Sequence, residues 1–79
     1  MTRVSKADIE LAQDGDAKAL ETLVLGIQDR IHKLALRMLA DPIAAQDATQ
    51  EILIRIVTKL STYRGDSSFE TWTYRVATN

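Results

Sequence analysis

Between residues 17 and 40, apolar side chains recur at steps of three and four positions. This spacing lines them along one side of an α-helix, and the alternation that marks a half-buried β-strand is absent from the chain. A helix with such a stripe has to bury it against other helices, so the pattern predicts an all-α fold. The helix is expected to start at the cap Asp16, to run to about Ala40 and to bury Leu20, Leu23, Val24, Ile27, Ile31, Leu34 and Met38. Gly26 inside it predicts a close helix crossing.

Two further helices are predicted from residues suited to capping. Ser5 with Asp8 forms a capping box that starts a first helix, and Gly15 ends it. Asp41 and Pro42 suit the cap and the first position of a third helix. The core side of that third helix is expected to hold Ala45, Ala48, Ile52, Ile56 and Leu60.

A fourth helix is predicted after a loop over residues 61–66. Ser67 and Glu70 have the spacing of a second capping box, and the buried stripe of this helix is expected to be Phe69, Trp72 and Val76. The chain stops at Asn79 without a glycine or proline stop signal, so we interpret this end as a truncation inside a helix. Residues 1–79 are therefore expected to form one domain, a compact bundle of three to four helices.

The composition excludes several classes of function. With no cysteine and a single histidine, His32, the chain offers no thiolate or multi-histidine metal site and no cysteine nucleophile. It also has no catalytic carboxylate pair, glycine-rich phosphate loop or nucleophile elbow, so we predict a protein that is not an enzyme and uses no cofactor or metal. No apolar run can span a bilayer, and residues 1–5 lack the core of a signal peptide, which predicts a cytoplasmic location.

The charge is distributed unevenly. A net charge of −1 is low for a nucleic-acid-binding protein, because phosphate neutralisation normally requires clustered Lys and Arg. Acidic residues occupy the stretch between Arg37 and Arg55, which contains no basic residue, whereas basic residues outnumber acidic ones from Arg55 to Arg75. The two surfaces are therefore expected to meet different partners.

One face of the third helix combines acidic, amide and apolar side chains. Its members follow the helical spacing and are Asp47, Gln50, Glu51, Ile54, Arg55 and Thr58. Ile54 is an apolar residue at the centre of a polar rim, as in a protein-docking surface. The spacing leaves a second interpretation open, in which this is an ordinary solvated face with Glu51 and Arg55 as a side-chain pair.

All of the aromatic residues fall between Tyr63 and Arg75, interleaved with hydroxyl side chains. Proteins that capture single-stranded bases combine aromatic stacking with hydroxyl and amide groups that read base edges. The alternative is that Phe69 and Trp72 form the core of a small helical domain, with Tyr63 free on the loop to bind. Within the same stretch, Gly65 is expected to supply a turn conformation.

Taken in order, these motifs resemble region 2 of the extracytoplasmic-function (ECF) group of bacterial sigma factors. Each motif is weak alone, but their order and spacing are specific, and the likeness covers essentially the whole chain. It rests on Gly15-Asp16, Asp41-Pro42, Asp47-Ala48-Thr49-Gln50-Glu51, Tyr63-Arg64-Gly65 and the run from Phe69 to Asn79.

The resemblance implies a role in transcription initiation with two partners. In that family, a helix with the Asp-x-x-Gln-Glu pattern binds the clamp helices of the RNA polymerase β′ subunit. By this likeness the polymerase-binding residues would be Asp47, Gln50, Glu51, Ile54 and Arg55. The last helix and the loop before it would recognise and melt the promoter −10 element on the single-stranded non-template strand, with Tyr63 and Asn79 lining the pocket of a flipped base. The implied DNA-binding residues are Tyr63, Arg64, Phe69, Thr71, Trp72, Arg75 and Asn79.

The chain also departs from the wider family. Housekeeping sigma factors carry adjacent tryptophans where Arg75 and Val76 stand here, as is usual in the ECF group. The basic continuation after Asn79 and the helix-turn-helix domain for the −35 element are missing, so we interpret the chain as a fragment. An anti-sigma factor is a further expected partner, and no membrane insertion is expected. The alternative function is a helical module that binds only protein, for example an anti-sigma factor.

Overall fold

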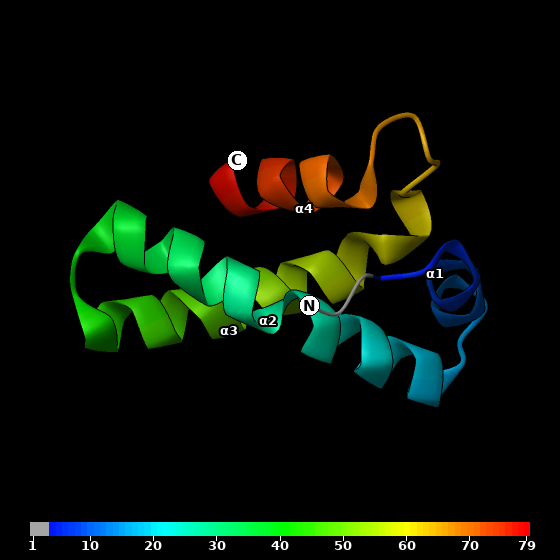
Figure 1. Ribbon diagram of the computed structural model, residues 1–79, viewed down its shortest axis with the longest axis horizontal. Coiled ribbons are helices and arrows are strands. Elements are labelled where there is room, and N and C mark those ends of the chain that lie inside the picture. Colours follow the sequence, from blue (N-terminus) through cyan, green and yellow to red (C-terminus); the bar gives the residue numbers. More distant parts are fainter. Residues whose placement is uncertain (1–3) are drawn as a thin grey trace.

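Two long helices joined by a tight turn organise the fold. The computed structural model describes residues 4–79, and the part of the signal-peptide argument that concerns residues 1–3 lies outside them. Helix α2 and helix α3 run antiparallel as a hairpin, α1 crosses the open end of this hairpin, and α4 lies along α3 (Figure 1). The elements are α1 Lys6–Gln13, α2 Ala17–Leu39, α3 Pro42–Lys59, the short 3-10 helix η1 Leu60–Thr62 and α4 Phe69–Thr78. The predicted all-α bundle is confirmed.

The starts of the first three helices are capped as predicted. The Ser5 hydroxyl accepts the amide hydrogen of Asp8 at 3.1 Å, and the Asp16 carboxylate accepts that of Ala19 at 2.9 Å. Asp41 accepts the amide of Ile43 at 3.0 Å, with proline at the first helical position. These side-chain acceptors satisfy amides that have no partner within the helix.

The cap of α4 differs from the prediction by one residue. Ser68, not Ser67, is the N-cap, and its hydroxyl accepts the amide of Thr71 at 3.1 Å. The carbonyl of Ser67 is instead the acceptor for the Tyr63 hydroxyl, at 2.7 Å. The capping-box spacing of Ser67 and Glu70 therefore predicted the cap one residue too early, and Ser67 belongs to the loop, where its carbonyl is bonded to Tyr63 four residues before it.

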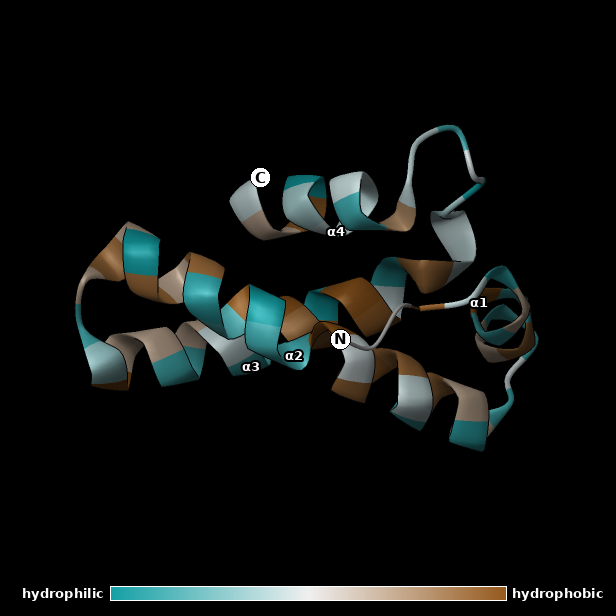
Figure 2. Ribbon diagram, in the orientation of Figure 1, coloured by the Kyte–Doolittle hydropathy of each residue, from teal (hydrophilic) through white to brown (hydrophobic). Residues whose placement is uncertain are grey.

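The core fills the space between the two arms of the hairpin. Ile27 and Ile56 are fully buried, and Ile31 and Leu23 are each 1% exposed. Figure 2 shows the contrast between this apolar interior and the hydrophilic loop that follows η1. None of the helices within residues 4–79 combines the length and the hydropathy that crossing a lipid bilayer requires.

Two predictions about α2 are wrong. Met38 was placed in the core but is 54% exposed, because it lies near the tip of the hairpin, which neither α1 nor α4 reaches (Figure 1). Gly26 does not mark a crossing of two helices. A Cβ atom there would lie 3.1 Å from Cγ2 of Val4, so the glycine makes room for the side chain of the segment that precedes α1.

Candidate binding surfaces

The outer face of α3 gathers the residues predicted to dock on a protein. Asp47, Gln50 and Glu51 are exposed, and Ile54, the next residue of this face along α3, is 65% exposed. Arg55 is half-buried at the edge of the same face. The geometry is thus an exposed apolar side chain with a rim of carboxylates and amides, carried by a helix whose opposite side is buried in the core.

This face extends further than the motif indicated. Ile43 is 76% exposed and lies four residues before Asp47, which puts it on the same side of α3 one turn nearer the hairpin tip. The sequence analysis missed Ile43, although the same helical spacing that links Asp47 to Ile54 would have included it.

A polar groove runs beside the docking face, between the two arms of the hairpin. Its volume is about 400 Å³. From α2 it is lined by Gln28, Asp29 and His32, and from α3 by Gln46, Asp47, Thr49 and Gln50. His32, the single histidine of the chain, is half-buried and lines this groove with residues of both helices, which only the pairing of α2 with α3 could reveal. The described residues contain no group of side chains arranged to hold a metal ion.

The aromatic residues at the start of α4 form a packed cluster. The ring of Tyr63 lies edge-on to Phe69, with centroids 5.4 Å apart, and also lies 5.4 Å from Trp72. Phe69 and Trp72 stack at 5.7 Å. Phe69 is only 4% exposed, whereas Trp72 is half-buried. Edge-on and offset-stacked pairs of this kind are favourable, so the cluster is a stable unit.

The prediction that Tyr63 is free on its loop is therefore wrong. Its ring packs on two aromatic neighbours, and its hydroxyl donates to the carbonyl of Ser67. Phe69, placed in the DNA-binding set, is buried beneath it and supports the loop from inside. The alternative interpretation, in which Phe69 and Trp72 belong to the core, describes Phe69 fully and Trp72 in part.

The polar members of the predicted DNA-binding set remain accessible. Arg64 and Arg75 are exposed, one on the loop and one on α4. Thr71 is exposed, and its hydroxyl accepts a 2.9 Å hydrogen bond from the Ser68 hydroxyl. Gly65 has a φ of +79°, the left-handed conformation expected for a turn glycine.

Tyr63 and Asn79 do not meet in one pocket. Tyr63 packs at the first turns of α4, and Asn79 follows the last residue of this ten-residue helix. At the usual helical rise, the length of α4 separates Asn79 from Phe69 by about 15 Å. A single strand that touches both residues would therefore have to run along α4.

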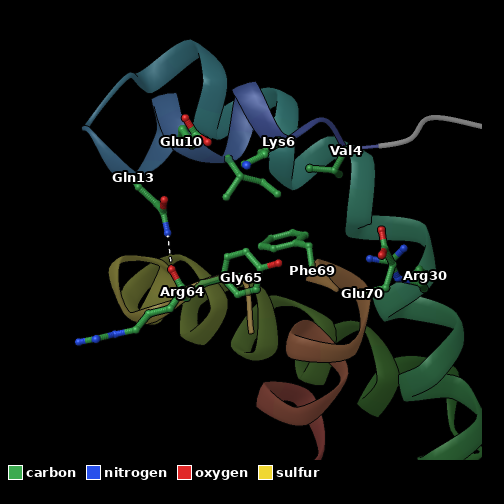
Figure 3. A pocket seen from close by; sticks show the side chains of 11 residues that line it. Val4, Lys6, Glu10, Gln13, Arg30, Arg64, Gly65, Phe69 and Glu70 are labelled. Atoms are coloured by element: carbon green, nitrogen blue, oxygen red, sulfur yellow. Dashed lines mark hydrogen bonds between the residues drawn. The ribbon is translucent and has the colours of Figure 1, made fainter. Parts of the chain in front are cut away.

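An open cavity of about 830 Å³ separates α1 from the loop and from the start of α4 (Figure 3). Val4, Ile9 and Phe69 provide its apolar lining, and Lys6, Glu10 and Glu70 are among its charged residues. The side chain of Gln13 spans from α1 to the loop. Its Nε2 donates to the carbonyl of Tyr63 at 2.8 Å and to that of Leu60 at 3.0 Å. Sequence reasoning missed Gln13, since a lone glutamine carries no signal for a contact so distant in the chain.

Comparison with known proteins assigns the class of this domain. The family described as Sigma-70 region 2 matches residues 23–79, which cover most of the hairpin, the loop and α4. The chain belongs to this family. Its relatives include sigma factors of the ECF group, as the motifs of the third and fourth helices predicted.

Three relatives illustrate the likeness. The chain is 44% identical over 71 residues to the RNA polymerase sigma-H factor of Pseudomonas aeruginosa and 38% identical over 71 residues to the ECF RNA polymerase sigma-E factor of Escherichia coli K12. Both alignments cover 90% of this chain and 37% of the relative. The ECF RNA polymerase sigma factor SigW of Bacillus subtilis is 34% identical over 79 residues, which is 42% of its length. The chain thus spans less than half the length of these curated relatives.

Proposed function

We propose that this domain acts in transcription initiation, in the cytoplasm, by binding the RNA polymerase core and recognising the −10 element of promoters. The outer face of α3 binds the clamp helices of the β′ subunit. The loop after η1 and the exposed side of α4 take the single-stranded non-template strand. The domain directs the polymerase and is not itself an enzyme.

The observation that carries the proposal is the exposed apolar side chain at the centre of the α3 face. Leaving Ile54 65% exposed keeps an apolar surface in water that a partner can cover. The rim of Asp47, Gln50 and Glu51 then supplies orientation and charge complementarity toward a basic partner surface. The rigid core beneath α3 means that little order has to be created when the partner binds.

The nucleic-acid part of the proposal rests on the exposed groups of the loop and α4. Arg64 and Arg75 can approach phosphates, and Thr71 offers a hydroxyl near the loop. The accessible part of Trp72 provides an aromatic surface. Since the net charge of the chain is only −1, the polymerase is expected to contribute much of the affinity for DNA.

Docking is tested with a substitution at the centre of the face and a matched one elsewhere. Ile54→Asp should weaken binding to a fragment containing the β′ clamp helices by about 1–4 kcal/mol, as truncations at interface centres do. Gln50→Ala should weaken it in the same direction. Leu11→Asp is the control, because Leu11 on α1 is 48% exposed and lies away from the α3 face. Affinity measured by calorimetry that is unaffected by Ile54→Asp would contradict the docking assignment.

The second candidate function is that of a helical module that binds only protein partners, for example an anti-sigma factor that binds to it. It is favoured by the packing of Tyr63 and the burial of Phe69, which remove stacking surface that bases would use. If the domain binds the polymerase but the complex shows no detectable binding of a −10 strand, this second function is the correct one.

A further inference from the structure

We propose that Gln13 is a positioning residue for the loop over Tyr63, Arg64 and Gly65, which presents Arg64 to DNA. The inference rests on the proposed function and adds a residue on α1 to it. Gln13 is the last residue of α1, yet its side-chain amide is bonded to residues 47 and 50 positions further along the chain. The two hydrogen bonds join α1 to η1 and to the residue that follows it, and Figure 3 draws one of them at the edge of the cavity.

The chemistry of the contact fixes the orientation of the amide. Both partners are backbone carbonyl oxygens, which only accept, so the nitrogen of the Gln13 amide and not its oxygen must face them. The two hydrogens of this NH₂ group thereby bond the two carbonyls at the ends of the η1 turn, those of Leu60 and Tyr63. With a side chain that has no donor at this position, both carbonyls would lose this hydrogen bond. They would then bond to water in the cavity, or the loop would change its position.

The two carbonyls are the ones that determine the course of the loop. The Leu60 carbonyl also accepts the amide of Tyr63 at 3.1 Å, which closes the turn of η1. The Tyr63 carbonyl belongs to the peptide bond that leads into Arg64. Holding both oxygens on one nitrogen therefore sets the direction in which the chain leaves η1, and with it the position of Arg64 and the turn at Gly65.

Packing alone leaves the loop open on this side. Apart from the Gln13 bonds, the space between α1 and the loop is the 830 Å³ cavity, and α1 packs mainly on α2. The loop is also held by the Tyr63 ring on Phe69 and Trp72 and by the bond from the Tyr63 hydroxyl to Ser67. Gln13 and the aromatic cluster thus hold the loop through separate contacts, the first through the carbonyls of Leu60 and Tyr63 and the second through the Tyr63 side chain.

The test compares two substitutions of similar length. Gln13→Met keeps the size of the side chain and removes the donor, whereas Gln13→Lys restores a donor that can reach carbonyl oxygens. Each variant is bound to the RNA polymerase core. Its affinity is then measured for a fluorescein-labelled single-stranded oligonucleotide selected from a random pool by the unsubstituted complex, with a scrambled oligonucleotide for comparison. The fluorescence emission of Trp72, the single tryptophan of the chain, is measured on each variant without the polymerase. It reports on the loop, because the Tyr63 ring lies against Trp72.

We expect Gln13→Met to bind the selected oligonucleotide about tenfold more weakly, as loss of hydrogen bonds to two carbonyls would produce. Affinity for the clamp-helix fragment should be unchanged, Trp72 emission should shift to longer wavelength, and Gln13→Lys should recover most of the oligonucleotide affinity. Equal oligonucleotide affinity in all three proteins would overturn the role of Gln13. A parallel loss of clamp and oligonucleotide binding would also overturn it, since Gln13 would then act through general stability. Failure of the unsubstituted complex to select any sequence would instead contradict the proposed function itself.

Discussion

The α2–α3 hairpin and the open end of the molecule, formed by α1, the loop and the start of α4, are held together by different kinds of contact. The α2–α3 hairpin is held by a continuous apolar core that includes Ile27, Ile31 and Ile56, and its outer face is carried rigidly on that core. The end formed by α1, the loop and the start of α4 joins the same core through Ile9 and Phe69, but it also surrounds a cavity, and its loop is held by an aromatic cluster and by single polar contacts such as those of Gln13. A rigid face suits docking on a protein, whereas a loop held by few contacts can adjust to a nucleic-acid strand.

The largest expected effect tests the rigid half, with two isoleucines two positions apart on α3. Ile56→Ala should lower the free energy of unfolding by about 2–5 kcal/mol, because Ile56 is fully buried and its truncation leaves a cavity. Ile54→Ala should change it by less than about 0.5 kcal/mol, since Ile54 is mostly exposed. Urea unfolding followed by circular dichroism measures both. A similar loss of unfolding free energy in the two variants would contradict the assignment of Ile56 to the buried side of α3 and Ile54 to the exposed side.

A smaller effect tests the open end at the cap of α4. Ser68→Ala should destabilise the protein by about 1 kcal/mol, because it removes the acceptor for the amide of Thr71. Ser67→Ala is the matched control and should be nearly neutral, since Ser67 contributes its backbone carbonyl and not its hydroxyl to the Tyr63 bond. Thermal unfolding of the two variants decides between these cap positions, and a larger loss for Ser67→Ala would restore the cap predicted from the sequence.

The smallest effect concerns the tip of the hairpin. Ala40 ends α2 with a φ of +54°, a left-handed conformation in which a side chain is unfavourable. Ala40→Gly should therefore stabilise the protein by about 0.5–1 kcal/mol, the relief of strain being reduced by the greater flexibility of glycine in the unfolded chain. The midpoint of chemical unfolding should rise. A lower midpoint would show that the tip is not strained at Ala40.

The hairpin could be derived almost completely from local patterns. Helical periodicity identified Ile27, Ile31 and Ile56 as core residues, and the caps Asp16 and Asp41 marked the starts of both helices, because these signals act between neighbours in the chain. The exposed position of Ile54 followed from the same periodicity. Met38 and Gly26 were exceptions, since the burial of Met38 depended on whether any other helix reached the tip, and the neighbour of Gly26 is Val4 in the segment before α1.

The arrangement at the open end was decided by tertiary structure. Spacing alone could not tell that Tyr63 would pack on Phe69 and Trp72, or that its hydroxyl would bond the carbonyl of Ser67 while Ser68 forms the cap. Nor could it bring Gln13 to the carbonyls of Leu60 and Tyr63, or show that His32 and Asp47 line one groove. Apart from the bond between Tyr63 and Ser67, which lie in the same connection, these arrangements involve residues on different elements, so they depend on how helices pack. Caps and apolar stripes depend instead on the backbone geometry of one helix.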